Sequence, residues 1–182
     1  MIDILTAIVF FIPAGLANAS PVFANKIPGF NRWQTPLDFG KSYRGKRILG
    51  DNKTWRGLLG GVIVGSLTGG LIYAVNPNFI NQLKIVPLAP FVDTLVIGGM
   101  LGFGALVGDA VESFFKRQAG VAPGKSWFPF DQVDYIIGGL VFTIPLVQLT
   151  PLGYVWIFIV WFSMHLVVSY IGYLLHFKDT PI

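Results

Sequence analysis

Long apolar runs alternate with polar stretches and divide the chain into five segments. The runs cover roughly residues 2–24, 57–75, 91–111, 133–149 and 152–177. A helix of about 20 apolar residues spans the hydrocarbon core of a bilayer, whereas barrel strands show short segments of alternating hydropathy. The pattern therefore predicts an all-α integral membrane protein with five transmembrane helices, in a single domain over residues 1–182.

The composition agrees with a membrane protein and excludes other classes. Of the 182 residues, 53% are hydrophobic and only 12% are charged, whereas a soluble domain has about 25% charged residues. Cysteine is absent from the sequence, so a secreted disulfide scaffold is also excluded. We expect a multi-pass protein of the cell membrane.

The basic residues predict the orientation in the membrane, because Lys and Arg gather on the cytoplasmic side. The stretch 25–56 contains eight of them: Lys26, Arg32, Lys41, Arg44, Lys46, Arg47, Lys53 and Arg56. The stretch 112–132 and the C-terminus add Lys116, Arg117, Lys125 and Lys178. With five crossings, all of these lie on one side and only Lys84 lies on the other. We therefore expect the N-terminus outside, the C-terminus inside and two large cytoplasmic loops.

Glycines recur at four-residue spacing in two of the predicted helices. They are Gly57, Gly61, Gly65 and Gly69 in one, and the pairs Gly98/Gly102 and Gly104/Gly108 in the other. Small residues at this interval let helix backbones approach closely within lipid. We expect both helices to pack tightly against neighbouring helices.

Two pairs of acidic residues flank the second large loop: Asp109 with Glu112, and Asp131 with Asp134. Residues three apart share a helix face, so the four carboxylates can meet near the inner membrane surface. Like charges at that distance require a cation or protonation, and oxygen ligands without Cys suit Mg²⁺. A second, monovalent cation stays open. The alternative is that Asp131 and Glu112 are solvated residues at a water boundary, with Asp131 as a helix N-cap. Two spaced pairs around one loop favour the metal site over this alternative.

The basic loops have the composition of a phosphate site. Arg44, Lys46, Arg47, Lys53 and Arg56 are interleaved with glycines, and Lys116 and Arg117 follow Glu112. Arg binds phosphate oxygens bidentately, and Lys supplies a point charge. The excess of Lys and Arg in cytoplasmic loops, or binding of these bases to anionic lipid headgroups, explains their number. It does not explain the glycines or the embedded Asp38 and Asp51. The Walker pattern is absent.

The order of these motifs resembles that of a known family. Gly108-Asp109-x-x-Glu112-Ser113-x-x-Lys116-Arg117, followed by Asp131-Gln132-x-Asp134, is similar to the signature of phosphatidate cytidylyltransferases. The stretch 36–57 resembles their short archaeal branch, the CDP-archaeol synthases. Gln132 stands where the longer enzymes have Arg, and residues 126–130 lack their histidine, which also favours the short branch.

The resemblance implies a reaction and a set of roles. CMP would pass from CTP to an isoprenoid-ether or diacyl glycerol phosphate, most specifically 2,3-bis-O-geranylgeranylglycerol 1-phosphate. CDP-archaeol and pyrophosphate would form, with Mg²⁺, at the cytoplasmic face. The implied catalytic bases are Lys53, Arg56, Lys116 and Arg117, and the implied metal ligands are Asp131, Asp134, Asp109 and Glu112. The implied substrate contacts are Asp38, Arg44, Lys46, Arg47, Thr54, Ser113 and Lys125.

Two points stay open, and two other functions compete. The sequence does not assign the triphosphate or the lipid phosphate to either basic loop, and it does not indicate the oligomeric state; no nucleic-acid partner is expected. A small transporter or channel would also contain intramembrane acids. Acids gathered at one cytoplasmic edge favour an enzyme instead. An alcohol phosphotransferase is weaker, because its D-G-x-x-A-R pattern is missing.

Overall fold

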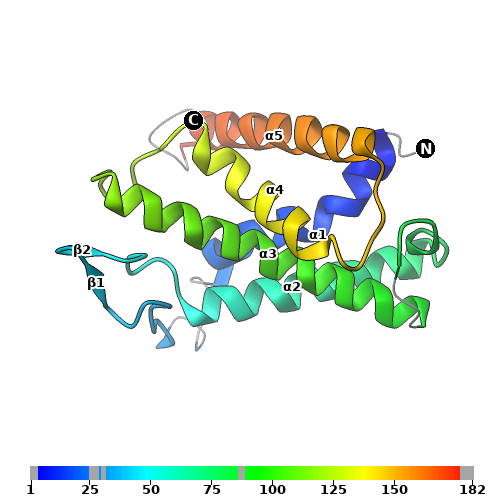
Figure 1. The fold of residues 1–182 in the computed structure, drawn as a ribbon, viewed down its shortest axis with the longest axis horizontal. Coiled ribbons are helices and arrows are strands. Elements are labelled where there is room, and N and C mark those ends of the chain that lie inside the picture. The colour runs from blue at the N-terminus through cyan, green and yellow to red at the C-terminus, as the bar shows by residue number, and fades with distance from the viewer. Residues whose placement is uncertain (1–3, 25–28, 30–31, 86–88, 177–182) are drawn as a thin grey trace.

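The computed structural model describes residues 4–24, 29, 32–85 and 89–176, and within them the chain is mostly helical. The α-helices are α1 (Ile4–Ala24), α2 (Trp55–Val75), α3 (Pro90–Gln118), α4 (Phe130–Thr143) and α5 (Pro151–Leu174). A short 3₁₀-helix, η2 (Ile80–Gln82), and two antiparallel strands, β1 (Ser42–Tyr43) and β2 (Lys46–Arg47), complete the fold. The strands form a hairpin near the end of the bundle where α3 finishes (Figure 1).

Four helices in the described residues are long and apolar enough to cross a bilayer: α1, α2, α3 and α5. The chain is thus a multi-pass membrane protein, but five crossings are not confirmed. The fourth helix was predicted over residues 133–149, and its predicted C-terminal end is wrong: α4 has 14 residues and ends at Thr143. At 1.5 Å per residue it is about 21 Å long, short of a core of about 30 Å. Pro145 cannot donate the backbone hydrogen bond that would continue the helix.

The second large loop was predicted over residues 112–132, and its predicted first residue is also wrong. Helix α3 continues for 29 residues to Gln118, so Glu112, Ser113, Lys116 and Arg117 are helical. Lys116 and Arg117 lie in its last turn, where cations interact favourably with the negative end of the helix dipole. The loop itself is confined to residues 119–129, which gives the motif residues of α3 a rigid support.

Glycines allow the backbones of α2, α3 and α4 to approach closely, as predicted. A Cβ added to Gly65 of α2 would lie 2.3 Å from the carbonyl oxygen of Gly98 in α3. A Cβ on Gly108 of α3 would lie 2.2 Å from the carbonyl oxygen of Asp134 in α4. Neither pair of helices could pack at this distance with a larger residue, so the glycines set the spacing of the helices around the acidic residues.

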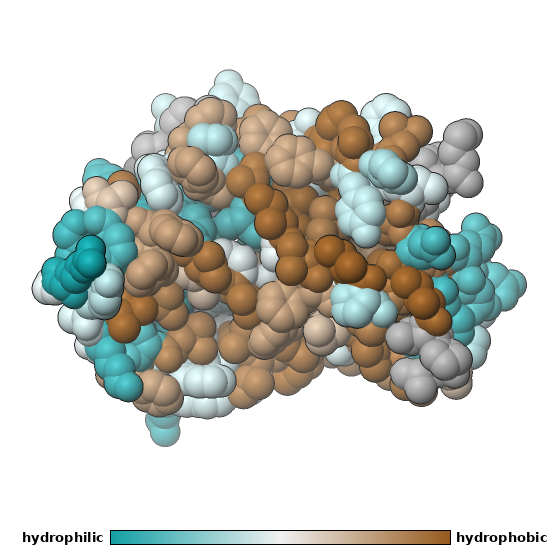
Figure 2. Space-filling view, in the orientation of Figure 1, coloured by the Kyte–Doolittle hydropathy of each residue, from teal (hydrophilic) through white to brown (hydrophobic). Residues whose placement is uncertain are grey.

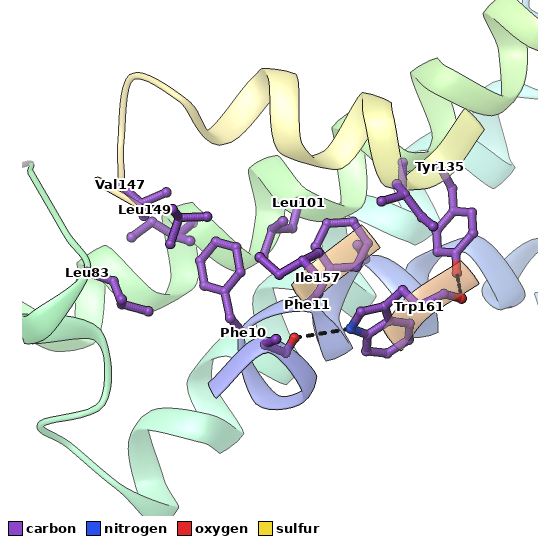
Figure 3. Close-up of a cluster of buried hydrophobic side chains, with 14 of the residues drawn as sticks. Phe10, Phe11, Leu83, Leu101, Tyr135, Val147, Leu149, Ile157 and Trp161 are labelled. Carbon is purple, nitrogen blue, oxygen red and sulfur yellow. Dashed lines mark hydrogen bonds between the residues drawn. The ribbon is translucent and has the colours of Figure 1, made fainter. Parts of the chain in front are cut away.

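A buried aromatic cluster joins α1, α4 and α5 (Figure 3). The Tyr135 hydroxyl donates a hydrogen bond to the Trp161 carbonyl oxygen at 2.9 Å, and the Trp161 indole N–H donates to the Ala7 carbonyl oxygen at 3.2 Å. The Phe11 ring packs beside Trp161, with ring centroids 5.6 Å apart. These contacts hold α4 against the bundle and so position Asp134, the residue before Tyr135.

The surface has the distribution expected of a membrane-spanning bundle. Hydrophobic residues cover the middle of the visible face, and hydrophilic residues gather toward its two ends (Figure 2). Along α2, for example, Leu59, Ile63, Leu67 and Leu71 are all exposed. Such a continuous apolar surface is stable where it contacts lipid chains. The hairpin and the ends of α3 and α4 that carry the acidic motif therefore lie at one polar end.

Candidate active site

Three carboxylates from two helices form a compact cluster. Asp109 and Glu112 project from one face of α3, and Asp134 projects from α4; their oxygen atoms lie within 4.8 Å of one another. Glu112 is 8% exposed and Asp134 is 9% exposed. The close contact between Gly108 and the Asp134 backbone brings the two helices together at this level. The predicted meeting of carboxylates from both acidic pairs is therefore present in the structure.

The fourth acid, Asp131, has other partners. The Lys116 ammonium donates to one of its carboxylate oxygens, and the Trp127 backbone N–H donates to the other. The same ammonium lies 3.7 Å from Oε1 of Glu112. Asp131 is thus linked to the cluster through Lys116 and through a direct side-chain contact with Glu112. It is not one of the three grouped carboxylates, and its role as a metal ligand stays a prediction.

The first loop reaches the cluster through Lys53. Its ammonium donates to Oδ2 of Asp109 at 2.6 Å. The backbone of Lys53 is held in place, because its carbonyl oxygen accepts from the Leu37 N–H at 2.7 Å. The next residue, Thr54, caps α2 by accepting a hydrogen bond from the Gly57 N–H. The first loop and the end of α3, which are distant in sequence, therefore each contribute a lysine to one acidic centre.

The donor set fits a hard divalent cation. The three ion pairs join two lysine ammonium groups to Asp109, Glu112 and Asp131, and Asp134 adds a fourth carboxylate to the group. With all four ionised, two negative charges are left without a matching lysine. Oε1 of Glu112 is buried and has no hydrogen-bond partner among the described residues. Ligand oxygens around one Mg²⁺ ion, each at about 2.1 Å from it, lie about 3–4 Å apart. Asp109, Glu112 and Asp134 can hold such an ion after small side-chain movements.

Asp38 organises the first loop. Its carboxylate accepts hydrogen bonds from the backbone N–H groups of Gly40, Leu49 and Gly50, and from Arg47 at 3.0 Å. Burial alone would raise the pKa of Asp38, but the hydrogen bonds from Leu49 and Arg47 outweigh it and lower the pKa to about 2. Both oxygens are engaged within the loop, so Asp38 shapes the loop, and its contact with substrate stays a prediction.

The hairpin is docked on the end of α3. The Lys46 ammonium donates to the Gln118 carbonyl oxygen at 2.6 Å, and the Gln118 amide contacts the Arg47 carbonyl oxygen at 3.5 Å. The Tyr43 ring packs against Phe114, with centroids 6.3 Å apart. A lysine at the carboxyl end of a helix also complements its dipole. Sequence reasoning missed Gln118 and Phe114, because neither residue belongs to a motif.

The remaining predicted residues fall into two groups. Those buried or half-buried at the same end of the bundle are Arg56 in the first turn of α2, and Ser113 and Arg117 in α3. The Ser113 hydroxyl lies 3.5 Å from Oε2 of Glu112. Those exposed on loops are Arg44, whose guanidinium lies 5.2 Å from the centre of the Tyr43 ring, and Lys125. The structure thus joins Lys53, Lys116 and Ser113 to the carboxylates directly, but not Arg44 or Lys125.

Comparison with known proteins gives a consistent result over the whole chain. The family model described as "CarS-like: CDP-archaeol synthase" matches residues 1–182. A CDP-archaeol synthase of Thermococcus kodakarensis is 36% identical over 180 residues, which is 98% of this chain and 96% of that protein. One from Pyrococcus furiosus is 36% identical over 186 residues, which is 100% of this chain and 99% of that protein.

A solved structure has the same fold. It is described as "an intramembrane enzyme for archaeal membrane lipids biosynthesis" and is 32% identical, with a TM-score of 0.73. The match covers 92% of this chain and 94% of that chain.

Proposed function

The chain belongs to the CDP-archaeol synthase family, and we propose that it transfers CMP from CTP to an isoprenoid-ether glycerol phosphate in archaeal phospholipid synthesis. The family membership makes it an enzyme, so the transporter alternative is not supported. The specific lipid is proposed to be 2,3-bis-O-geranylgeranylglycerol 1-phosphate, and the products are CDP-archaeol and pyrophosphate.

The reaction is a displacement at phosphorus. An oxygen of the lipid phosphate forms a new bond to the α-phosphorus of CTP, while the bond from that phosphorus to the bridging oxygen of pyrophosphate breaks. The attacking phosphate is already ionised at neutral pH, so it needs no strong general base. Catalysis then depends on alignment of the two phosphates and on neutralisation of their charge.

The basic residues around the carboxylates are suited to these tasks. Lys53 and Lys116 place ammonium groups beside the carboxylates, and Arg56 and Arg117 lie at the same end of the bundle. These four bases would align the phosphates and stabilise negative charge on the phosphoryl oxygens. A Mg²⁺ ion held by Asp109, Glu112 and Asp134 would act as a Lewis acid toward those oxygens.

The position of the site suits one soluble and one amphiphilic substrate. The acidic cluster lies on the last third of α3 and the first two turns of α4, and the middle of the visible face of the bundle is apolar (Figure 2). We propose that the end of the bundle with this cluster faces the cytoplasm, where CTP is found, while the lipid chains stay in the bilayer. The observation that carries the proposal is the convergence of three carboxylates from α3 and α4 with two lysines, one from the first loop and one from α3.

The test is transfer of radiolabel from each of the four α-labelled nucleoside triphosphates into the lipid phase. Purified protein in detergent is given Mg²⁺ and either the isoprenoid-ether or a diacyl glycerol phosphate. The proposal expects transfer from CTP, faster with the ether lipid, and none after EDTA treatment. Equal transfer from all four nucleotides, or transfer in EDTA, would contradict it.

A further inference from the structure

Lys53 competes with a metal ion for one of the three grouped carboxylates. Its ammonium donates to Oδ2 of Asp109 at 2.6 Å, and Asp109 shares the cluster with Glu112 and Asp134. An ammonium at this distance already neutralises part of the negative charge that would attract a cation. A divalent ion that uses this oxygen of Asp109 must therefore displace the lysine.

We propose that Lys53 is an exchangeable counter-ion: it neutralises Asp109 until a divalent cation takes its place, and its ammonium then binds a phosphate oxygen of the nucleotide. This inference rests on the proposed function and adds a step to it. Each charge keeps a partner in this exchange. The divalent cation takes the place of the ammonium beside the Asp109 carboxylate, and the displaced ammonium pairs with a phosphate oxygen of the nucleotide.

The geometry allows the side chain of Lys53 to move while its backbone stays in place. The backbone carbonyl accepts a hydrogen bond from Leu37, and the following residue caps α2. The side chain itself is 22% exposed and that of Asp109 is 25% exposed, so the ion pair is open to solvent and to ligands. A lysine ammonium on a flexible four-carbon stem can turn to a neighbouring oxygen without moving the loop.

Lys116 is not equivalent to Lys53. Its side chain is only 10% exposed and lies between two carboxylates, those of Glu112 and Asp131. Breaking two contacts in a more buried place costs more than breaking one contact at a partly exposed place. The two lysines therefore differ in role, and Lys53 is the one that exchanges.

The experiment measures Mn²⁺ binding to the full-length protein in detergent without nucleotide, by electron paramagnetic resonance. Because a partly exposed ion pair stabilises its partners only modestly, Lys53→Met should bind Mn²⁺ about two- to fivefold more tightly than the natural sequence. Lys53→Arg, which keeps the charge, should stay close to the natural affinity. Lys41→Met is the matched control, because Lys41 is an exposed lysine in the same loop, and its affinity should not change.

A second readout separates exchange from a purely structural role. With Mg²⁺ present, Lys53→Met should bind CTP more weakly, as judged by equilibrium dialysis with labelled nucleotide. Tighter Mn²⁺ binding together with weaker CTP binding supports the inference, whereas a lysine that only stabilises the fold would weaken both. Thermal unfolding of each variant checks that the loop is intact, and Lys53→Gln replaces Lys53→Met if the latter does not fold.

Unchanged or weaker Mn²⁺ binding by Lys53→Met would overturn the inference. The variant Asp134→Asn separates failure of this inference from failure of the proposed function, because it removes a charge from the cluster and leaves Lys53 unchanged. Weaker Mn²⁺ binding by Asp134→Asn locates the cation at the cluster. Natural affinity in Asp134→Asn would contradict the metal site on which the proposed function depends, and the inference with it.

Discussion

Replacing Gly108 with Ala tests how closely the metal site depends on helix spacing. The added Cβ would lie 2.2 Å from the carbonyl oxygen of Asp134 and 2.9 Å from its carbonyl carbon. Contacts below 3.0 Å are essentially never seen for Cβ atoms, so α3 and α4 must separate by about 0.8 Å or more in a close-packed interior. Overpacking of this kind costs about 1–3 kcal/mol of stability.

The separation acts directly on the carboxylates. Gly108 precedes Asp109, and the contacted residue is Asp134 itself, so the two sides of the cluster move apart. Mg²⁺ demands near-ideal octahedral geometry, and a misplacement of about 1 Å at a reacting centre can lower the rate about 100-fold. We expect Gly108→Ala to lose at least tenfold in Mn²⁺ affinity and about 100-fold in turnover.

The assays are Mn²⁺ titration, formation of CDP-lipid and thermal unfolding, all on protein in the same detergent. Gly60→Ala is the matched control, because nothing lies within 4 Å of a Cβ at that position of α2. Since Ala favours helix over Gly by about 1 kcal/mol, Gly60→Ala should be neutral or slightly stabilising. If Gly108→Ala matched Gly60→Ala in metal affinity and turnover, the proposed dependence of the site on helix spacing would be refuted.

Three further predictions concern packing, pH and orientation. Gly65→Leu should lower the thermal unfolding temperature, because its Cβ would lie 2.3 Å from the Gly98 carbonyl oxygen. The control Gly60→Leu should not lower it, and equal unfolding temperatures for the two variants would show that Gly65 faces lipid. The lowered pKa of Asp38, about 2 against 3.8, stabilises the folded state by about 2 kcal/mol above pH 4, and this is lost as the pH falls toward 2. Unfolding measured across that range should therefore depend less on pH in Asp38→Asn, and identical pH dependence would contradict the assignment. In this cysteine-free chain, an impermeant maleimide should label Asn81→Cys from outside intact cells and leave Lys125→Cys unlabelled; the reverse pattern would invert the topology.

The sequence predicted a helix correctly where a long apolar run alone is enough to identify it. Apolar runs located α1, α2, α3 and α5, since each is close to the length that a bilayer requires. The end of α4 was wrong because hydropathy continues through residues 144–149 after the backbone has left the helix. Pro145, which has no backbone N–H to donate to a helix, lies just beyond that end, and an average over apolar residues does not register it.

The acidic cluster was partly predictable from spacing. Residues three apart share a helix face, and this placed Asp109 with Glu112. The loop that joins the two predicted helices made the helices neighbours, and so brought Asp134 toward this pair. The same rule placed Asp131 beside Asp134, but it could not show that Lys116 and the Trp127 backbone bind both oxygens of Asp131. Such partners depend on how α3, α4 and their connecting loop fold together.

Contacts between the first loop and α3 could not be predicted from the sequence. Lys53 and Asp109 are 56 residues apart, and Lys46 and Gln118 are 72 apart. Positive charge in the first loop predicted a phosphate site but no specific partner for any lysine. Only the packing of α2 on α3, which glycines bring together, places the start of α2 and the end of α3 side by side.

The most direct test of the central claim compares CTP labelled at the α-phosphorus with CTP labelled at the γ-phosphorus, in proteoliposomes that contain the isoprenoid-ether glycerol phosphate and Mg²⁺. The account predicts that the α label enters the lipid phase while the γ label leaves as pyrophosphate, in equal amounts. Asp134→Asn should lose this transfer, and Gly60→Ala should retain it. Entry of the γ label into lipid, or natural transfer by Asp134→Asn, would contradict cytidylyl transfer at this carboxylate cluster.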